Sequence, residues 1–307
     1  MMTTDETPIP ENPKAAFVAV IGAPNTGKST LINRAVGTKV SIVSPKVQTT
    51  RTRVLGIMMQ GDSQLIFVDT PGIFQPSKRL DRAMVAAAWS GAEDADNLLL
   101  LIDAGRGIDG NTGRIIDALI ERGVRCDAVI NKTDSVRKPQ LLELAAALSE
   151  KGIFDQIYMI SALTGEGVDD LIQALADGAP KGPWMFPPDQ ASDMPERNLA
   201  AEITREQLFR QLHQELPYAL TVETESWEER ADGSIAVAQI IFVERESQRA
   251  IVLGKGGQRI RTIGTASRLE LSEILECKVH LNLFVKVREK WGDDPERYGL
   301  WGLDFNA

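Results

Sequence analysis

Short apolar runs alternate with amphipathic segments of helical period between Phe17 and about Ala176. This alternation predicts an α/β domain with a mostly parallel sheet, because a helix has to return the chain to the start of each next strand. The runs expected to form its strands are FVAVI, QLIFVD, NLLLLID, DAVIN and QIYMI. One more run, VLGIMM, precedes QLIFVD after a short polar gap, so we expect these two to form an antiparallel hairpin.

The alternating pattern stops between Ala179 and Pro195. Five prolines fall in this stretch, at positions 180, 183, 187, 188 and 195. Each removes a backbone N–H that a helix or an inner strand would need. We therefore predict a proline-rich linker at 179–195, which follows the α/β domain at 15–178.

A smaller α+β module is predicted beyond the linker, at 196–291, followed by a C-terminal tail at 292–307. Its expected elements, in order, are an amphipathic helix at 198–214, strands at 220–227 and 234–243, a long helix that ends near 277 and a strand at 279–287. The stretch at 247–253 fits a helix or a strand equally well.

The segment GAPNTGKS joins the first predicted strand to a helical stretch, which is the setting of a phosphate-binding P-loop. Its glycines allow backbone N–H groups to point at a phosphate, and the helix dipole favours that charge. We expect Lys28 to reach the β- and γ-phosphates and the Ser29 hydroxyl to bind Mg2+, which prefers oxygen ligands. A glycine-rich turn without a ligand is the alternative. The residues predicted to contact the nucleotide here are Gly22, Ala23, Pro24, Asn25, Thr26, Gly27, Lys28, Ser29 and Thr30.

A second nucleotide contact is predicted at DTPG, which consists of Asp69, Thr70, Pro71 and Gly72 and follows the strand QLIFV. At the carboxyl end of a strand beside the P-loop, Asp69 can hold the Mg2+ shell and the Gly72 amide can contact the γ-phosphate. Taken alone, DTPG could equally be an ordinary strand-ending turn. Its distance along the chain from the P-loop favours the nucleotide contact.

The loop at 38–53 contains QTTR, with Thr49 and Thr50. A threonine hydroxyl in such a loop can bind Mg2+ when the γ-phosphate holds the loop closed, and we favour Thr50 for this role. The alternative is that both threonines enter a strand. The predicted metal ligands are therefore Ser29, Thr50 and Asp69, and the predicted catalytic residues are Lys28, Thr50 and Gly72.

The segment NKTD follows the strand DAVI and predicts which base is bound. Guanine presents two adjacent N–H donors, at N1 and the exocyclic N2, and the Asp134 carboxylate can accept from both. Adenine lacks this pair and would leave the carboxylate unpaired, at a cost of several kcal/mol. The segment SAL follows the next strand and can cap the base through backbone amides. The predicted base-site residues are Asn131, Lys132, Asp134, Ser161, Ala162 and Leu163.

Composition narrows the class of protein. With 43% hydrophobic and 25% charged residues, the chain of 307 residues has the balance of a soluble globular protein. No segment has the ~20 apolar residues that span a bilayer, and residues 1–14 contain no apolar run, so we expect no secretory signal and a cytoplasmic location. Cys126 and Cys277 are too few for a disulfide framework and fit no zinc-site spacing, so we expect both to be packing residues.

The net charge of −9 argues against a nucleic-acid partner, but the charge is unevenly distributed. Between positions 245 and 268 six basic residues stand against one acidic residue, Glu246. The six are Arg245, Arg249, Lys255, Arg259, Arg261 and Arg268. Such a basic island on an acidic protein indicates a local surface for a nucleic-acid backbone. A solvated basic helix beside a flexible turn is the alternative.

Two sets of motifs together resemble the Era family of bacterial GTPases, which belongs to the TrmE-Era-EngA-like branch of the TRAFAC class. The first set is GxxxxGKS, QTTR, DTPG, NKxD and SA, and the second is LPY, VERESQ and VLGKGGQRIRTIG. The resemblance covers about 16–291 and implies a P-loop G domain followed by a type II KH domain. It implies a helix at 247–253 and a GKGG loop that RNA backbone can approach closely. The RNA-binding residues that it implies are Gly254, Lys255, Gly256, Gly257, Arg259 and Arg261.

The same resemblance implies a biological role. It is that of a GTPase switch that uses GTP or GDP with Mg2+, binds 16S rRNA near its 3′ end and acts in assembly of the 30S ribosomal subunit. We expect a monomer without a DNA partner, and weak peripheral association with the inner membrane is reported for family members. There are three alternatives. One is a nucleotide-dependent regulatory protein at the membrane with little turnover, and another is a binding module that uses GTP only as a structural ligand while its KH part contacts protein. The third is an ATP-dependent phosphotransferase, which NKTD disfavours.

Two residues set expectations for the rate of hydrolysis. Ile73 follows Gly72, where GTPases that orient water with a glutamine place that residue. Isoleucine cannot orient water, so we expect slow hydrolysis that depends on the substrate phosphate, a bound cation or a partner. In related GTPases an asparagine at the position of Asn25 helps to hold K+, and we expect the same here.

Overall fold

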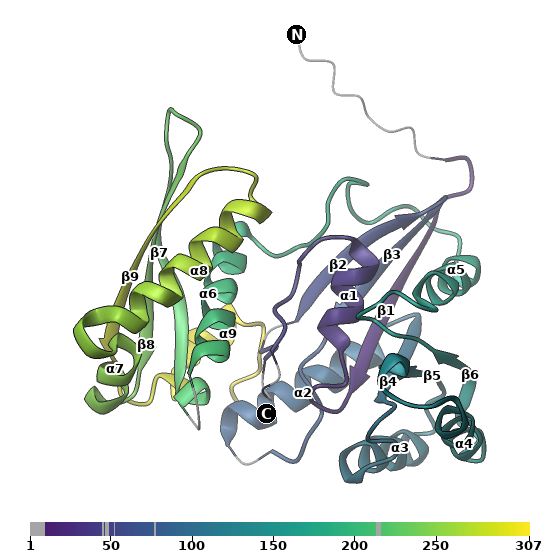
Figure 1. The fold of residues 1–307 in the computed structure, drawn as a ribbon. Coiled ribbons are helices and arrows are strands. Elements are labelled where there is room, and N and C mark those ends of the chain that lie inside the picture. The colour runs from purple at the N-terminus through teal and green to yellow at the C-terminus, as the bar shows by residue number, and fades with distance from the viewer. Residues whose placement is uncertain (1–9, 45, 47–48, 52, 77, 213–215) are drawn as a thin grey trace.

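The structure is a computed structural model that describes residues 10–44, 46, 49–51, 53–76, 78–212 and 216–307. Two domains lie side by side, the first drawn in purple to teal and the second in green (Figure 1). The first contains a six-stranded sheet in the order β2-β3-β1-β4-β5-β6. Its strands are β1 (Lys14–Gly22), β2 (Val54–Gln60), β3 (Ser63–Asp69), β4 (Asn97–Asp103), β5 (Cys126–Asn131) and β6 (Phe154–Met159).

Strand pairing in this sheet is parallel except between β2 and β3, which pair antiparallel. The predicted mostly parallel sheet with one antiparallel strand is therefore confirmed. Helices α1 (Lys28–Val36) and α5 (Val168–Gly178) pack on one face. Helices α2 (Arg79–Glu93), α3 (Gly110–Arg122) and α4 (Lys138–Ser149) pack on the other. Parallel strands end at the same edge of a sheet, so the segments that follow β1, β3, β4 and β5 meet there.

The second domain has a three-stranded sheet in the order β7-β8-β9. Strands β7 (Leu220–Glu229) and β8 (Ile235–Val243) are antiparallel, and β9 (Val279–Val287) pairs with β8 in parallel. Helices α6 (Glu196–Gln211), α7 (Glu246–Leu253) and α8 (Gln258–Ile274) share a buried apolar cluster with the sheet. The α+β module is confirmed, and the stretch that fitted a helix or a strand is helix α7.

Helix α6 differs from the predicted amphipathic helix, because all its side chains from Ile203 to Phe209 are buried. Even Arg205 and Glu206 are 1% and 0% exposed. Apolar residues of this helix pack on the sheet of its own domain, while Arg205 donates a hydrogen bond to the Thr49 carbonyl of the first domain. The prediction of a simple amphipathic helix is wrong, because its polar side faces another domain instead of water. The predicted last residues, 213–214, lie outside the described residues.

The linker between α5 and α6 contains no helix or strand, as its prolines predict. It nevertheless lies against the outer edge of the sheet. Ile57 of β2 donates its backbone N–H to the Ala191 carbonyl at 2.9 Å, and the Gln64 side chain accepts from the Met185 and Phe186 amides at 2.8 and 3.0 Å. An edge strand exposes unpaired backbone groups, so the linker covers part of that edge.

The segment predicted as a C-terminal tail is folded. It forms a short 3-10 turn at Trp291–Asp293 and helix α9 (Pro295–Leu300), and it lies beside α2. Tyr298 and Leu303 are 1% and 6% exposed because they pack on α2. The yellow C-terminal segment therefore runs back from the second domain to the first (Figure 1).

Both cysteines are free thiols that pack in apolar clusters, as predicted. Burial raises the pKa of the Cys126 thiol to about 12, so it stays protonated and unreactive at neutral pH. Within the described ranges of the chain, we find no helix with the length and apolar character of a membrane span.

Candidate functional site

The P-loop lies between β1 and α1, and its backbone requires glycine at two positions. Gly22 has φ +154°, and a Cβ there would lie 2.5 Å from the Leu101 carbonyl oxygen. Gly27 has φ +100°, and its Cβ would lie 2.3 Å from Nδ2 of Asn131. Both distances are shorter than van der Waals contact. The absence of side chains at these positions brings the loop backbone close to β4 and β5 and allows its N–H groups to surround a phosphate.

Lys28 begins α1, and its side chain folds back over this loop. Its Nζ atom donates to the carbonyls of Gly22 at 3.2 Å and Ala23 at 3.1 Å. Burial lowers the pKa of Lys28 to about 8, although the nearby Asp69 carboxylate opposes the shift. A phosphate placed beside the ammonium would favour its charged form. The structure therefore holds this cation at the mouth of the loop.

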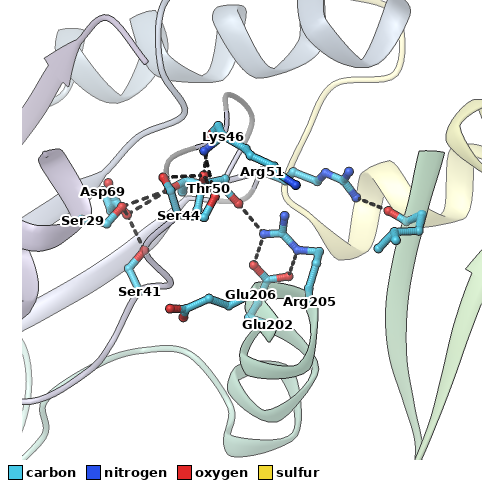
Figure 2. Close-up of polar contacts among 12 residues, drawn as sticks. Ser29, Ser41, Ser44, Lys46, Thr50, Arg51, Asp69, Glu202, Arg205 and Glu206 are labelled. Carbon is cyan, nitrogen blue, oxygen red and sulfur yellow. Dashed lines mark hydrogen bonds and ion pairs between the residues drawn. The ribbon is translucent and has the colours of Figure 1, made fainter. Parts of the chain in front are cut away.

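The predicted Mg2+ ligands Ser29, Thr50 and Asp69 converge (Figure 2). Ser29 Oγ lies 2.8 Å from Asp69 Oδ2 and 3.1 Å from Thr50 Oγ1, and Thr50 Oγ1 lies 3.2 Å from Asp69 Oδ2. Burial raises the pKa of Asp69, while hydrogen bonds from Ser41 and Ser29 oppose that shift. Asp69 Oδ1 is buried and has no hydrogen-bond partner among the described residues. Two hydroxyls and an incompletely paired carboxylate suit Mg2+, so the residues fit this ion.

Ser41 is a contact of Asp69 that the motifs did not predict. Its hydroxyl donates to Asp69 Oδ2. Asn33 of α1 fixes the backbone around it, because Asn33 Oδ1 accepts from the amides of Val40 and Ser41, both at 2.9 Å, and Nδ2 donates to the Ser41 carbonyl at 2.7 Å. The start of loop 38–53 is thereby attached to α1. A single serine in a loop has no characteristic spacing, so no sequence pattern could have identified it.

The DTPG segment crosses over the P-loop. The Ile73 amide donates to the Gly22 carbonyl at 3.0 Å, and a Cβ on Gly72 would lie 3.0 Å from Pro24 Cα. Ile73 is 7% exposed and packs in the core, so its side chain presents nothing to a water molecule. A pocket in front of these segments is lined by Lys28, Ser29, Thr50 and Gly72, among others. The other predicted phosphate-site residues, Ala23, Pro24, Asn25, Thr26, Thr30, Thr70 and Pro71, belong to the same two segments.

Asn131 connects the predicted base site to the P-loop. Its Nδ2 atom donates to the Thr26 carbonyl at 2.8 Å, and its Oδ1 atom accepts from the Ala162 amide at 2.9 Å. The residue is 1% exposed, so both hydrogen bonds are shielded from water. One side chain therefore sets the spacing between the phosphate cradle and the SAL segment that should cap the base.

Asp134 is oriented by the SAL segment. The Ser161 hydroxyl donates to Asp134 Oδ1 at 2.5 Å and accepts from the Thr164 amide at 3.1 Å. Asp134 itself is exposed, and Leu163 of the SAL segment is 70% exposed. The carboxylate is therefore held next to the backbone that should cap the base.

Lys132 is attached to the P-loop and to the end of β4. It has φ +65°, and Nζ donates to the Asn25 carbonyl and to Asp103 Oδ2, both at 2.7 Å. Sequence reasoning missed Asp103, although its place at the end of NLLLLID was a usable signal. Polar residues at carboxyl ends of parallel strands tend to face the ligand.

Replacing Gly27 with alanine should disrupt this arrangement. The new Cβ would collide with Asn131, so either the P-loop or the base cap has to shift. We expect the Gly27→Ala variant to bind GTP at least about tenfold more weakly. A tenfold rise in Kd corresponds to a loss of only roughly 1.4 kcal/mol of binding free energy. Gly37→Ala is the matched control, since Gly37 has φ +82° but no neighbour within 4 Å of its Cβ position. Nucleotide titration together with thermal unfolding measures both, and equal losses of affinity would contradict the argument.

The predicted RNA site lies where α7 meets α8. The GKGG loop uses three positive φ angles, +71° at Gly254, +60° at Gly256 and +75° at Gly257. A Cβ on Gly254 would lie 2.7 Å from the Arg259 Cβ, whereas nothing lies within 4 Å of that position on Gly256. Gly254 therefore permits the turn into α8, and Gly256 leaves the outer surface of the loop open to a backbone.

The basic side chains of this region differ in freedom. Lys255, Arg259 and Arg261 are all exposed. Of the three, Arg259 stays beside α7, because its Nη1 atom donates to the Ile251 carbonyl at 2.9 Å. Ile251 is 46% exposed, an unusual exposure for an isoleucine, next to the loop. Exposed cations and a bare loop beside an apolar side chain suit contact with a nucleic-acid backbone and its bases.

The chain matches two family models. Residues 17–132 match the family described as 50S ribosome-binding GTPase, and residues 215–292 match the KH domain family. The first stretch contains the P-loop, DTPG and the start of NKTD. The second contains the GKGG loop.

Curated relatives carry the name GTPase Era. The chain is 60% identical over 292 residues to GTPase Era of Rhizobium meliloti, which covers 95% of this chain and 93% of the relative. It is 58% identical over 292 residues to GTPase Era of Agrobacterium fabrum, covering 95% of this chain and 92% of the relative.

Two solved structures match over nearly the whole length. One is a variant of Aquifex aeolicus Era bound to GDP·AlF4−, with a TM-score of 0.88 at 38% identity, covering 94% of this chain and 99% of that chain. The other is Era in complex with MgGDPNP and nucleotides 1506–1542 of 16S ribosomal RNA, with a TM-score of 0.89 at 38% identity and the same coverage.

Proposed function

This chain belongs to the Era family of GTPases, and from that premise we propose that it is a GTP-hydrolysing switch that binds 16S rRNA near its 3′ end in 30S subunit assembly and maturation. The first domain is the G domain, which takes GTP or GDP with Mg2+. The second is the KH domain, which takes the RNA. A relative solved with both MgGDPNP and 16S rRNA supports the pairing of these two ligands.

The main evidence for nucleotide binding is the hydrogen-bonded bridge through Asn131. It joins the P-loop at Thr26 to the SAL segment at Ala162, beside the fixed Asp134 carboxylate. Phosphate and base positions are thus set by one buried side chain. A glycine-rich turn without a ligand has no need of such a bridge.

In the proposed mechanism, the P-loop amides and Lys28 hold the β- and γ-phosphates, and the Gly72 amide contacts the γ-phosphate. Ser29, Thr50 and Asp69 would hold Mg2+, which would neutralise phosphate charge when bound. Asp134 selects guanine through its N1 and N2 donors. Because Ile73 is buried and apolar, it cannot orient the attacking water, and intrinsic turnover is slow.

The RNA contacts are assigned to Gly254, Lys255, Gly256, Gly257, Arg259 and Arg261 as part of this proposal. The G domain is assigned to 15–178, the linker to 179–195 and the KH domain to 196–291, followed by the segment 292–307. The protein acts as a monomer in the cytoplasm. Peripheral association with the inner membrane is its alternative location, and fractionation of cells with and without high salt distinguishes the two.

Calorimetry and crosslinking test the function. With Mg2+ present, GTP and GDP should bind and ATP should fail to compete, because adenine leaves Asp134 unpaired. Crosslinking in cells should recover the 3′ region of 16S rRNA on the wild-type protein. Adenine nucleotides bound as tightly as guanine nucleotides would refute the G-domain assignment, and recovery of unrelated RNA alone would refute the rRNA assignment.

The cation requirement gives a separate prediction. Asn25 has φ +65° within the P-loop and lies next to the phosphate cradle. If K+ supplies positive charge there, hydrolysis should be at least several-fold faster in KCl than in NaCl at equal ionic strength. The Asn25→Ala variant should lose most of that difference. Phosphate release under both salts measures it, and equal wild-type rates would rule out a role for K+.

A further inference from the structure

The C-terminal segment, defined as residues 292–307 together with Trp291, the last residue of the KH range, packs against helix α2, which follows the DTPG motif. Tyr298 and Leu303 form one buried cluster with Ala83 and Met84 of α2. Tyr298 is 1% exposed, so this cluster is closed to water. Burial of large apolar side chains on both sides means that α2 cannot move relative to the segment without a loss of contact.

An aromatic contact strengthens this packing at the start of α2. The Arg79 guanidinium lies 4.4 Å from the ring centroid of Phe305. Phe305 and Tyr298 stack edge to face with centroids 5.0 Å apart. Both geometries are attractive, and a cation over a ring is worth about 0.5 to 2 kcal/mol. The end of α2 nearest to DTPG is thus attached to the C-terminal segment.

Arg51 brings loop 38–53 to the same segment. It follows Thr50 directly, is 2% exposed, and donates from Nη1 to the Leu220 carbonyl of β7 at 2.9 Å. Its guanidinium also lies 5.3 Å from the ring centroid of Trp291. Figure 2 shows Arg51 extending away from the Ser29–Asp69 cluster and toward the KH domain. Because Thr50 and Arg51 are adjacent, the position of one constrains the other.

The C-terminal segment is in turn fixed to the KH domain. Trp291 is 2% exposed and donates from Nε1 to the Ala219 carbonyl at 3.1 Å. Arg297 pairs with Glu223 of β7 at 2.7 Å and lies 4.7 Å from the ring centroid of Phe242 on β8. Since these contacts involve two strands of the KH sheet, the segment should move as part of that domain.

Helices α6 and α8 also hold loop 38–53. Arg205 donates to the Thr49 carbonyl, and Lys39 pairs with Glu206 and Glu270. These contacts reach the loop. The C-terminal segment differs because it meets both the loop, through Trp291, and helix α2.

We propose that the C-terminal segment is the element through which the KH domain senses the γ-phosphate. It positions Arg51, and hence Thr50, at the Mg2+ site while it packs on α2, the helix that follows Gly72 in the chain. A γ-phosphate that draws Thr50 and Gly72 inward favours the arrangement in which both contacts are made. By linkage, RNA that favours the same arrangement strengthens binding of GTP over GDP, and the reverse holds equally. This inference rests on the proposed function and names the residues that regulate it.

Two variants of the α2 contact test the inference. Arg79→Ala removes the cation, and Phe305→Leu removes the ring but keeps apolar volume, so the fold should persist in both. We expect the preference for a GTP analogue over GDP, the ratio of the two Kd values with Mg2+, to fall about three- to tenfold. The difference in affinity for the 16S rRNA 3′ fragment between the two nucleotide states should fall by the same factor.

Arg122→Ala is the matched control. The Arg122 guanidinium lies 4.5 Å from the ring centroid of Trp89 on α2. This substitution therefore also removes a cation–π contact to α2, but one that does not involve the C-terminal segment. The control should keep the wild-type ratio, and thermal unfolding with GDP should show all three variants folded. An unchanged ratio in both test variants, or an equal fall in the control, would overturn the inference. So would wild-type protein that binds RNA equally in both states, whereas wild-type protein without GTP or RNA binding would refute the proposed function itself.

Discussion

The Asp134→Asn variant is expected to lose GTP binding and to gain binding of xanthosine triphosphate. The carboxylate accepts from N1–H and N2–H of guanine, while an amide would present a donor to one of them. Loss of two charge-assisted hydrogen bonds should cost about 3 to 4 kcal/mol, or roughly a hundred- to a thousandfold in Kd. Xanthine carries a carbonyl oxygen at C2, which can accept a hydrogen bond from the amide nitrogen of the new asparagine. The N1–H of xanthine can then donate to the amide oxygen of the same side chain.

The structure indicates that this exchange can keep the hydrogen bond from Ser161. The Ser161 hydroxyl that donates to Asp134 Oδ1 can donate equally to an asparagine oxygen, because both are carbonyl-type acceptors. Titration of both nucleotides against wild type and variant measures the exchange. Asp117→Asn, an exposed substitution on α3, is the control and should leave both affinities unchanged. A variant that still prefers GTP would mean that Asp134 does not read the base.

Features that depend on neighbouring residues in the sequence were predictable. Gly22 and Gly27 lie in a strand–loop–helix context that is fixed by local pattern, and the structure gives each a backbone that other residues cannot adopt without collision. The convergence of Ser29 with Asp69 also followed, because parallel strands end at one edge of a sheet. The runs at 234–243 and 279–287 likewise predict strands, and they form β8 and β9.

Features that depend on contact between the domains were not predictable. Arg205 and Glu206 look like the solvent face of an amphipathic helix, and their burial follows from loop 38–53, which lies far away in sequence. The apolar residues around Tyr298 and Phe305 follow neither helical nor strand spacing, so the hydrophobic pattern predicts only a C-terminal tail there. Their role depends on the surface of α2, and no local rule in either segment describes the match between them. The sequence pattern describes each domain, whereas these contacts lie between the domains.

The Lys255→Glu variant is expected to lose about tenfold or more in affinity for the 16S rRNA 3′ fragment at 0.1 M salt. Lys255 is exposed on a loop whose neighbour Gly256 has no atom within 4 Å of its Cβ position, so a phosphate can approach the ammonium. Reversal of the charge replaces an attraction with a repulsion at that place. GTP binding should be unchanged, because Lys255 lies in the KH domain, away from the P-loop.

The salt dependence separates this effect from unfolding of the KH domain. One lost phosphate contact should reduce the slope of log K against log salt concentration by about one, whereas an unfolded domain would lose nearly all of it. Lys278→Glu is the matched control, since Lys278 is exposed in the same domain but lies beyond the opposite end of α8 from the loop. Equal losses in the two variants would show that net charge, and not the GKGG loop, attracts the RNA. A loss confined to Lys255→Glu would place a phosphate of the RNA at the loop.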